Sequence, residues 1–330
     1  MNVITGGGAF TARNISDINQ NFGQVGAPFT PNGKVVYLQP GATGVQTQTG
    51  SQTQPYTSLA TAYSALVTSQ NNVLMLVGDG TTGGTARNDA ATTWSISGGS
   101  LIGYCSPTLF SQRARIAPTG ATTAFTPFFT ISGSGNLFQN ISWFDGFNTG
   151  TTSQICMVVS GTRNVFQNCQ IAGMGDTTSA GSSGSRSLKI TGGENLFEDC
   201  VIGLDTIART TTNASLEFSG APARNVFRRC IFPFDATNAG VLGILGTGAE
   251  CMDRFQVFDN CLFINNIKST STAMTVLGSL TSASPGGLLL YKQSVFVGIG
   301  EYGDTNGLAN SYIDGLTGAA ATSGIAVNPS

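Results

Sequence analysis

The residues of this 330-residue chain that could do chemistry are mostly isolated acids. Two of them stand at matching positions: Asp205 ends the segment IGLD, and Asp235 ends FPFD 30 residues later. If these segments lie on neighbouring turns of a repeat, the carboxylates come close together, which would suit a cation or a catalytic acid pair. Asp145 and Asp176 follow related segments, so we expect all four acids to line one outer face. The alternative is that Asp205 and Asp235 are hydrated loop carboxylates.

The usual partners of a catalytic acid are missing from the sequence. Histidine does not occur, which removes the commonest general base and any Ser-His-Asp triad. Glu198 and Asp199 are adjacent acids, but Arg228 and Arg229 take the same places in the next related segment. We therefore interpret these acids as members of a ladder on the surface of a repeat. The sequence favours a protein without catalytic activity, with a glycan hydrolase or lyase as the alternative.

Cysteine usage indicates neither a disulfide framework nor a metal site. The seven cysteines are an odd number, no CxxC pair occurs, and four of the cysteines recur at one position of a repeat. Free cysteine commonly behaves as a small buried hydrophobic residue. We expect no metal and no cofactor, and synthesis in a reducing cytoplasm.

Composition argues against several classes of partner. Charged residues make up only 10% of the chain, the net charge is -2, and no basic run occurs, which speaks against binding to nucleic acid or to an anionic membrane. No stretch approaches 18 unbroken apolar residues, and the N-terminus MNVITGGGAF does not have the pattern of a signal peptide. The 44 glycines fit an all-β protein with many turns.

The elements that must position these residues come from a phrase that recurs at intervals of 28 to 33 residues. The phrase reads Asn-(Leu/Val)-Phe-x-(Asn/Asp)-Cys-x-apolar. Its copies, some of them degenerate, begin at Asn136, Asn164, Asn195, Asn225, Gln256 and Leu289. A fixed period in this range is typical of a solenoid.

The phase of the phrase predicts a strand, a tight bend and a second strand. Cys200 and Ile202 alternate as one face of a strand should, but Phe197 is out of phase with them by one residue. A corner between Phe197 and Cys200 lets all three face the interior. The corner residues tolerate a left-handed backbone in four copies, as Asn140, Asn168, Asp199 and Asn260. Arg229 does not fit this pattern, so we expect another corner conformation there.

A further strand precedes each phrase, so each period holds about three strands and little helix. This pattern predicts a parallel β-helix, in which equivalent residues of successive coils stack about 4.8 Å apart. The expected internal stacks are Phe138, Phe166, Phe197, Phe227 and Phe258, and beside them Cys169, Cys200, Cys230 and Cys261. On the outside, Glu198, Arg228 and Asp259 alternate in charge, so neighbouring coils should attract one another.

The chain divides into three parts in this interpretation. Residues 31–300 form the β-helix, with a capping helix at about residues 55–69, and residues 301–330 form a C-terminal extension. Residues 1–30 contain FTARNISDINQNF, whose apolar residues have helical spacing. This segment either caps the solenoid or anchors the protein to a larger assembly. Its expected contact residues are Phe10, Arg13, Ile15, Ile18 and Phe22.

Two resemblances follow from these motifs. PYTSLATAYSAL, NVLMLVGDG and the N-x-F-x-N-C coils resemble the pectate-lyase-like right-handed parallel β-helix superfamily over roughly residues 35–300. The histidine-free sequence departs from that superfamily's polygalacturonase-like members, which carry a Gly-His-Gly element. FTARNISDINQNF with NVFQNCQIAGMG and NLFEDCVIGLDT resembles virion-associated β-helix proteins of tailed phages.

The second resemblance implies a structural protein on the particle surface, made in the host cytoplasm. We expect a homotrimer that decorates or cements the head, or forms a short fibre, and that contacts other virion proteins such as the major capsid protein. The alternative is a tailspike or receptor-binding protein that binds or cleaves host surface polysaccharide. A free bacterial enzyme is a third interpretation, which the missing secretion signal disfavours.

One aromatic cluster is a candidate contact surface. Trp143, Phe144 and Phe147 follow the first clear corner. They could stack on a sugar or be buried between subunits, and a trimer of β-helices favours the subunit interface.

Overall fold

The computed structural model describes most of residues 33–314. The exceptions in this range are residues 46, 79–80, 82, 89, 106–113, 120–124, 147–152, 266–267, 305 and 308–309. The predicted anchor segment at residues 1–30 lies outside the described residues, as do Phe147 and residues 315–330.

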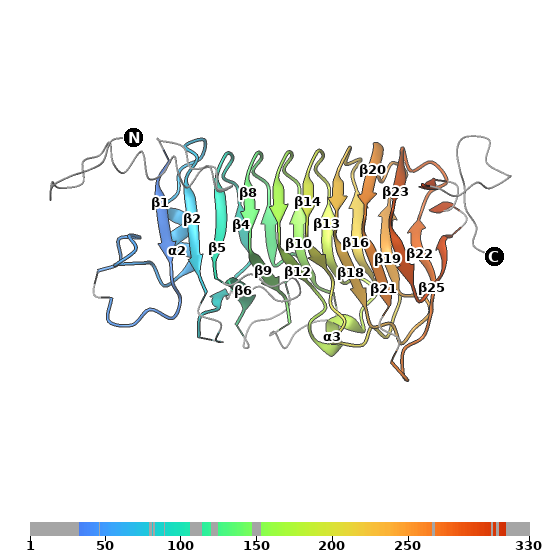
Figure 1. Cartoon of the computed structure of the whole chain (residues 1–330), viewed down its shortest axis with the longest axis horizontal. Helices are drawn as coiled ribbons and strands as arrows, with labels where there is room; N and C mark the ends of the chain where they lie inside the picture. Colours follow the sequence, from blue (N-terminus) through green and yellow to red (C-terminus); the bar gives the residue numbers. More distant parts are fainter. Residues whose placement is uncertain are drawn as a thin grey trace, which may run out of the picture.

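The chain forms a right-handed parallel β-helix of about 30 residues per coil (Figure 1). Each coil adds strands to three parallel sheets, and in each sheet the strands of successive coils stack along the long axis of the molecule. Sheet A consists of β1 (Val35–Leu38), β2 (Val73–Val77), β5 (Ser100–Tyr104), β8 (Leu137–Gln139), β11 (Val165–Gln167), β14 (Leu196–Glu198), β17 (Val226–Arg228), β20 (Arg254–Asp259), β23 (Gly287–Lys292) and β26 (Ser311–Ile313). Sheet B consists of β3 (Ala86–Asn88), β6 (Ala114–Pro118), β9 (Ile141–Phe144), β12 (Gln170–Ala172), β15 (Val201–Ile202), β18 (Ile231–Phe234), β21 (Leu262–Asn265) and β24 (Val295–Val297). Sheet C consists of β4 (Thr92–Trp94), β7 (Phe129–Ile131), β10 (Ile155–Val159), β13 (Arg186–Ile190), β16 (Ala214–Ser219), β19 (Leu242–Thr247), β22 (Met274–Leu280) and β25 (Ile299–Gly303).

The predicted phenylalanine stack runs through the interior beside sheet A. Phe197 lies between Phe166 and Phe227, with ring centroids 4.4 and 4.8 Å away and the rings almost parallel. Tyr291 continues the stack beyond Phe258 at 5.1 Å. Every ring of the predicted stack is fully buried. The phase deduced from the sequence is therefore confirmed.

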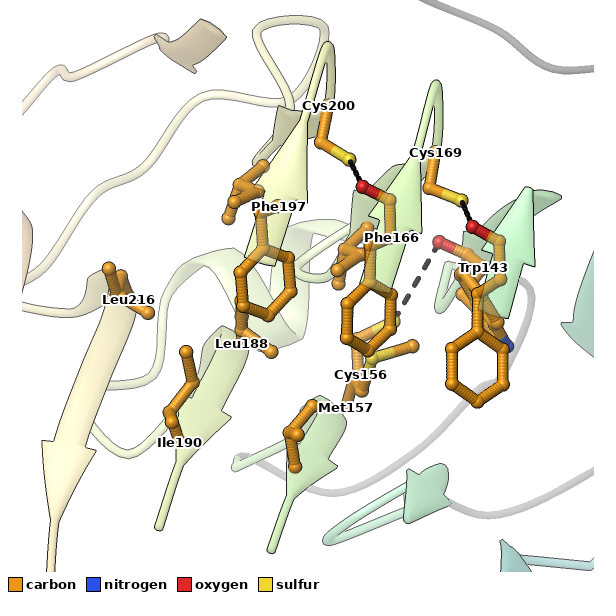
Figure 2. Packing of buried hydrophobic residues seen from close by; sticks show 14 of the residues in the cluster. Trp143, Cys156, Met157, Phe166, Cys169, Leu188, Ile190, Phe197, Cys200 and Leu216 are labelled. Atoms are coloured by element: carbon orange, nitrogen blue, oxygen red, sulfur yellow. Dashed lines mark hydrogen bonds between the residues drawn. The ribbon is translucent and has the colours of Figure 1, made fainter. Parts of the chain in front are cut away.

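The predicted cysteine stack is also confirmed, and its thiols make hydrogen bonds that the sequence did not reveal. Cys200 donates from its Sγ to the backbone carbonyl oxygen of Phe166 at 3.5 Å, one coil earlier (Figure 2). The other three cysteines repeat this contact at 3.3 to 3.4 Å. At the last copy, Ser294 Oγ donates to the carbonyl oxygen of Phe258 at 3.1 Å. From the copy at Asn164 onward, this position therefore holds a small side chain that donates to the carbonyl, whereas the copy at Asn136 has Ile141 there.

The corner between sheets A and B is left-handed in every copy of the phrase. The asparagine and aspartate corners have φ values between 48° and 56°, as predicted. The prediction for Arg229 was wrong, because its φ is 52°. Its guanidinium donates to both carboxylate oxygens of Asp199 on the preceding coil, at 2.7 and 2.9 Å. Arginine seldom adopts a left-handed backbone, and here that conformation occurs together with two charge-assisted hydrogen bonds to Asp199.

The asparagine that opens each phrase forms a buried ladder. Asn164 Oδ1 accepts from the backbone N–H of Asn136 and from its Nδ2, at 3.0 and 2.9 Å. Asn164 in turn donates to Asn195, and Gln256 continues the ladder. These bonds satisfy buried backbone groups where the chain turns into sheet A.

Both ends of the β-helix differ from the sequence prediction. The capping helix α2 spans only Leu59–Ser64, because Tyr56 instead bridges to Leu38. At the other end, β25 pairs with β22 and β26 pairs with β23, so strand pairing continues past residue 300. The boundary predicted at residue 300 therefore falls inside the stack. Within the part of the chain that the structure describes, no helix has the length and apolar character needed to cross a membrane.

Candidate functional site

A pocket of about 260 Å³ lies on the outer face of sheet B. Its floor comes from outward-facing side chains of β6, β9 and β12, and one wall comes from residues 203–206, which follow β15. The lining includes Arg115, Phe144, Gln170, Asp205, Thr206 and Pro233.

Register places the floor residues side by side. Arg115 pairs with Ser142 across β6 and β9, and Ser142 pairs with Gln170 across β9 and β12. The wall departs from the strand at Gly203, whose φ of 117° favours glycine. A Cβ at Gly203 would also come within 2.9 Å of the Pro233 carbonyl oxygen. Sheet pairing and this one glycine therefore shape the pocket.

The pocket combines an aromatic surface with polar groups. The Arg115 guanidinium lies 5.6 Å from the centroid of the Phe144 ring. Gln170 Oε1 accepts from Ser142 Oγ at 2.9 Å, so the donors of its amide remain for a ligand. A half-exposed ring beside amide, guanidinium and carboxylate groups suits a ligand with one apolar face and several hydroxyls.

The two predicted acids occupy different environments. Asp205 lines the pocket. Asp235 is buried, and its carboxylate accepts from Lys268 Nζ at 2.9 Å and from Ser271 Oγ at 3.1 Å. Lys268 Nζ also donates to the backbone carbonyl oxygen of Asp205 at 3.4 Å. The cation between Asp205 and Asp235 is therefore the side chain of Lys268, from a later coil. Asp235 supports the pocket wall and does not face a ligand.

The expectation that Asp145 and Asp176 line the same outer face was wrong. After β9 the side chains keep alternating, so Trp143 faces inward, Phe144 outward and Asp145 inward. Among the residues that the structure describes, neither carboxylate oxygen of Asp145 has a hydrogen-bond partner. Burial, together with the nearby charge of Asp176, raises the pKa of Asp145 to about 7. Asp176 itself caps the short helix α3 (Thr177–Ala180) by accepting from the N–H groups of Thr178 and Ser179.

The predicted aromatic contact surface is divided between interior and exterior. Trp143 is fully buried and packs edge-on against Phe138 and Phe166, so it is not available to a subunit interface. Of the two members that the structure describes, Phe144 is the one at the surface, where it lines the pocket.

The outer acids of sheet A are paired with cations, as the ladder interpretation predicts. Glu198 lies 3.4 Å from Arg228 and 3.0 Å from Arg229, and Asp259 lies 3.6 Å from Arg228 and 3.4 Å from Lys292. These carboxylates belong to one surface network, in which Arg228 lies on the coil between Glu198 and Asp259.

A third charged group, on the outer face of sheet C, was missed in the sequence. Glu217 accepts from Arg186 at 2.7 Å and from Lys189 at 2.8 Å, and also from Thr247. Burial opposes its charge, but Lys189 and Arg186 outweigh burial and hold the pKa of the Glu217 carboxyl below its ordinary value. The sequence did contain a sign of this ion pair, because Lys189 and Glu217 occupy the same position in the related strands SLKIT and SLEFS.

Comparison with known proteins identifies the fold. No protein-family model matches the chain, and no curated protein matches it. Among solved structures, pectin methylesterase from Aspergillus niger is 15% identical with a TM-score of 0.53, covering 85% of this chain and 92% of that one. PemA, a pectin methylesterase from Erwinia chrysanthemi, is 15% identical with a TM-score of 0.51, covering 88% and 91%. A pectin methylesterase in complex with a hexasaccharide is 16% identical with a TM-score of 0.51, covering 84% and 92%. The chain therefore has the pectate-lyase-like β-helix fold, and identities this low show the fold alone.

Proposed function

We propose that this chain is a structural protein on the surface of a tailed-phage particle, a head decoration or cement protein or a short fibre, without catalytic activity. The observation that carries the proposal is the pairing of acids with cations on neighbouring coils, at Glu198, Asp259, Glu217 and Asp235. Such acids hold coils together and are not free for acid–base chemistry. The resemblance of FTARNISDINQNF and the following coils to virion-associated β-helix proteins supports the location.

The proposed partners are further copies of the chain, in a homotrimer, and other virion proteins such as the major capsid protein. The chain would be made in the host cytoplasm and then join the particle. The test is its copy number, by quantitative mass spectrometry of purified virions against the major capsid protein. A fixed ratio near that of the capsid protein indicates a decoration protein, and a few trimers per particle indicate a spike or fibre. Absence from particles contradicts the proposal.

A second candidate function, binding of host surface polysaccharide, is favoured by the pocket on sheet B. A sugar ring could place its apolar face on Phe144 while Gln170, Arg115 and Asp205 contact its hydroxyls. The fold is compatible with this function, because a structural neighbour was solved with a bound hexasaccharide.

Replacing Phe144 tests the polysaccharide hypothesis. We expect Phe144→Ala to weaken binding of host capsule or lipopolysaccharide oligosaccharides roughly tenfold, measured by calorimetry, because an aromatic surface is lost. The matched control is Tyr104→Ala, which removes a ring that is 66% exposed on sheet A. Equal affinities for the wild type and Phe144→Ala would remove the pocket from consideration. Release of reducing ends or unsaturated sugars from these polysaccharides would contradict the non-catalytic assignment.

A further inference from the structure

The outer surface of sheet B changes character along the stack. Its C-terminal part is covered by five aliphatic side chains from β18, β21 and β24, which we term the aliphatic face: Ile231, Leu262, Ile264, Val295 and Val297. The alternate residues Phe232, Phe263 and Phe296 point inward and stack on one another, which fixes the aliphatic residues outward. Val295 is 54% exposed, and the other four are partly exposed.

One outward position shows the change most clearly. Register aligns the residues that follow the corner in successive coils, in the order Arg115, Ser142, Gln170, Val201, Ile231, Leu262 and Val295. The first three are polar and the last four are aliphatic. The residue before the corner stays polar or charged from Gln139 to Lys292. The position is buried at Ser142, Gln170 and Val201, but from Ile231 to Val295 it is aliphatic and at least partly exposed. An outward position that is both aliphatic and exposed over successive coils indicates a surface that another molecule covers.

The geometry of this surface favours a second copy of the chain as the partner. Its side chains form rows about 4.8 Å apart, the spacing of parallel strands. A surface that fits between these rows needs the same spacing, and another copy of this β-helix supplies it along its whole length. The aliphatic face carries no charge, and the net charge of the chain is only -2, so copies can approach with little repulsion. On the adjoining sheet, Asp259 is already paired with Arg228 and Lys292, so association would leave no unpaired charge there.

We propose that the aliphatic face is the surface through which copies of this chain associate. The inference rests on the homotrimer of the proposed function and names the surface that forms it. It replaces the aromatic cluster expected from the sequence, because Trp143 is inside the core. The pocket on sheet B adjoins the aliphatic face. Val201 and Pro233 line the pocket, and they pair in register with Ile231 and Ile264 of the aliphatic face.

The experiment introduces a charge into the aliphatic face of the full chain and measures the mass in solution by light scattering after size-exclusion chromatography. Two variants are compared, Leu262→Lys in the centre of the face and Val295→Lys, whose side chain already extends into solvent. The matched control is Gln167→Lys, on the outer face of sheet A, where a lysine can pair with Glu198. Circular dichroism shows whether each variant keeps its strands.

We expect the wild type and Gln167→Lys to have three times the mass of one chain, and both face variants to be folded monomers. A trimeric Val295→Lys and a trimeric Leu262→Lys would overturn the choice of surface while leaving the trimer intact. A monomeric wild type would overturn both the trimer and its surface. Neither result affects the copy-number test of the virion assignment.

Discussion

Asp145 carries an ionisable group in the interior of the β-helix. Within the described part of the chain, both of its carboxylate oxygens are buried without a hydrogen bond, and the fully buried side chain of Gln154 has no hydrogen-bond partner either. An ionised carboxylate in this position would be costly, so the proton is retained until about pH 7. Cys156 lies close enough that the charge of Asp145 contributes to raising the pKa of its thiol, after burial.

The buried carboxyl of Asp145 should make stability fall as pH rises. Between about pH 4 and pH 7 the folded chain holds this proton and the unfolded chain does not, so unfolding releases it and becomes easier at higher pH. The loss should be on the order of 4 kcal/mol in total and should level off above pH 7. We expect Asp145→Asn to melt higher than the wild type at pH 8 and at nearly the same temperature at pH 4. Thermal unfolding followed by circular dichroism at both pH values measures the difference.

The control for Asp145 is Asp253→Asn, which removes an exposed acid. Its melting temperature should track that of the wild type across the pH range. A gap between Asp145→Asn and the wild type that stayed constant from pH 4 to pH 8 would show that ionisation of Asp145 is not its cause.

At the scale of elements, stacking between coils gives the β-helix its regularity. Each phrase contributes a ring to the interior and a left-handed corner between sheets A and B, and four copies add a thiol hydrogen bond to the preceding coil. Because these contacts join neighbouring coils only, the stability of the stack depends on every internal layer being filled.

Shortening a side chain in the middle of the phenylalanine stack tests this dependence. Phe197→Ala should lower the free energy of unfolding by roughly 3–5 kcal/mol, because it leaves a cavity between two fixed rings. Leu196→Ala, on the outward side of the same strand, should cost much less because its side chain is only partly buried. Urea denaturation of the two variants provides the comparison, and similar losses would be inconsistent with the register described above.

At the scale of the whole molecule, the sequence predicts that attachment to the particle and folding of the β-helix depend on different parts of the chain. The described β-helix begins with β1 at Val35 and has its own cap in α2, which packs beside β1 (Figure 1). Residues 1–30 lie outside the described residues, and their role in attachment stays a prediction from the sequence.

Deleting residues 1–30 should separate the two roles. We expect the shortened chain to keep the circular dichroism spectrum and melting temperature of the full chain, because the deletion leaves every described strand in place, from β1 at Val35 onward. We also expect it to be absent from purified particles, as measured by mass spectrometry. Incorporation at the level of the full chain would remove the anchor role from this segment.

The sequence by itself determined the repeating parts of the molecule. In a coil of nearly constant length, each position of the phrase meets the same position of the next coil, so one phase assignment places every copy. Phe197, Cys200 and Ile202 could therefore be assigned to the interior, and Glu198 to an outer ladder. Among the corners of the phrase, the one at Arg229 was mispredicted, because its shape goes with a contact to Asp199 in another coil.

Only the tertiary structure decided the burial and the contacts of residues outside the repeating phrase. Segments between strands vary in length, so equal spacing in the sequence no longer implies equal position in space. Asp235 is held by Lys268, which is 33 residues away, and Asp145 is buried because the alternation of β9 continues beyond the strand. The pocket and the aliphatic face depend on which side chains of several coils meet on one outer surface. Local sequence spacing specifies the stack, whereas contacts between coils specify its surface.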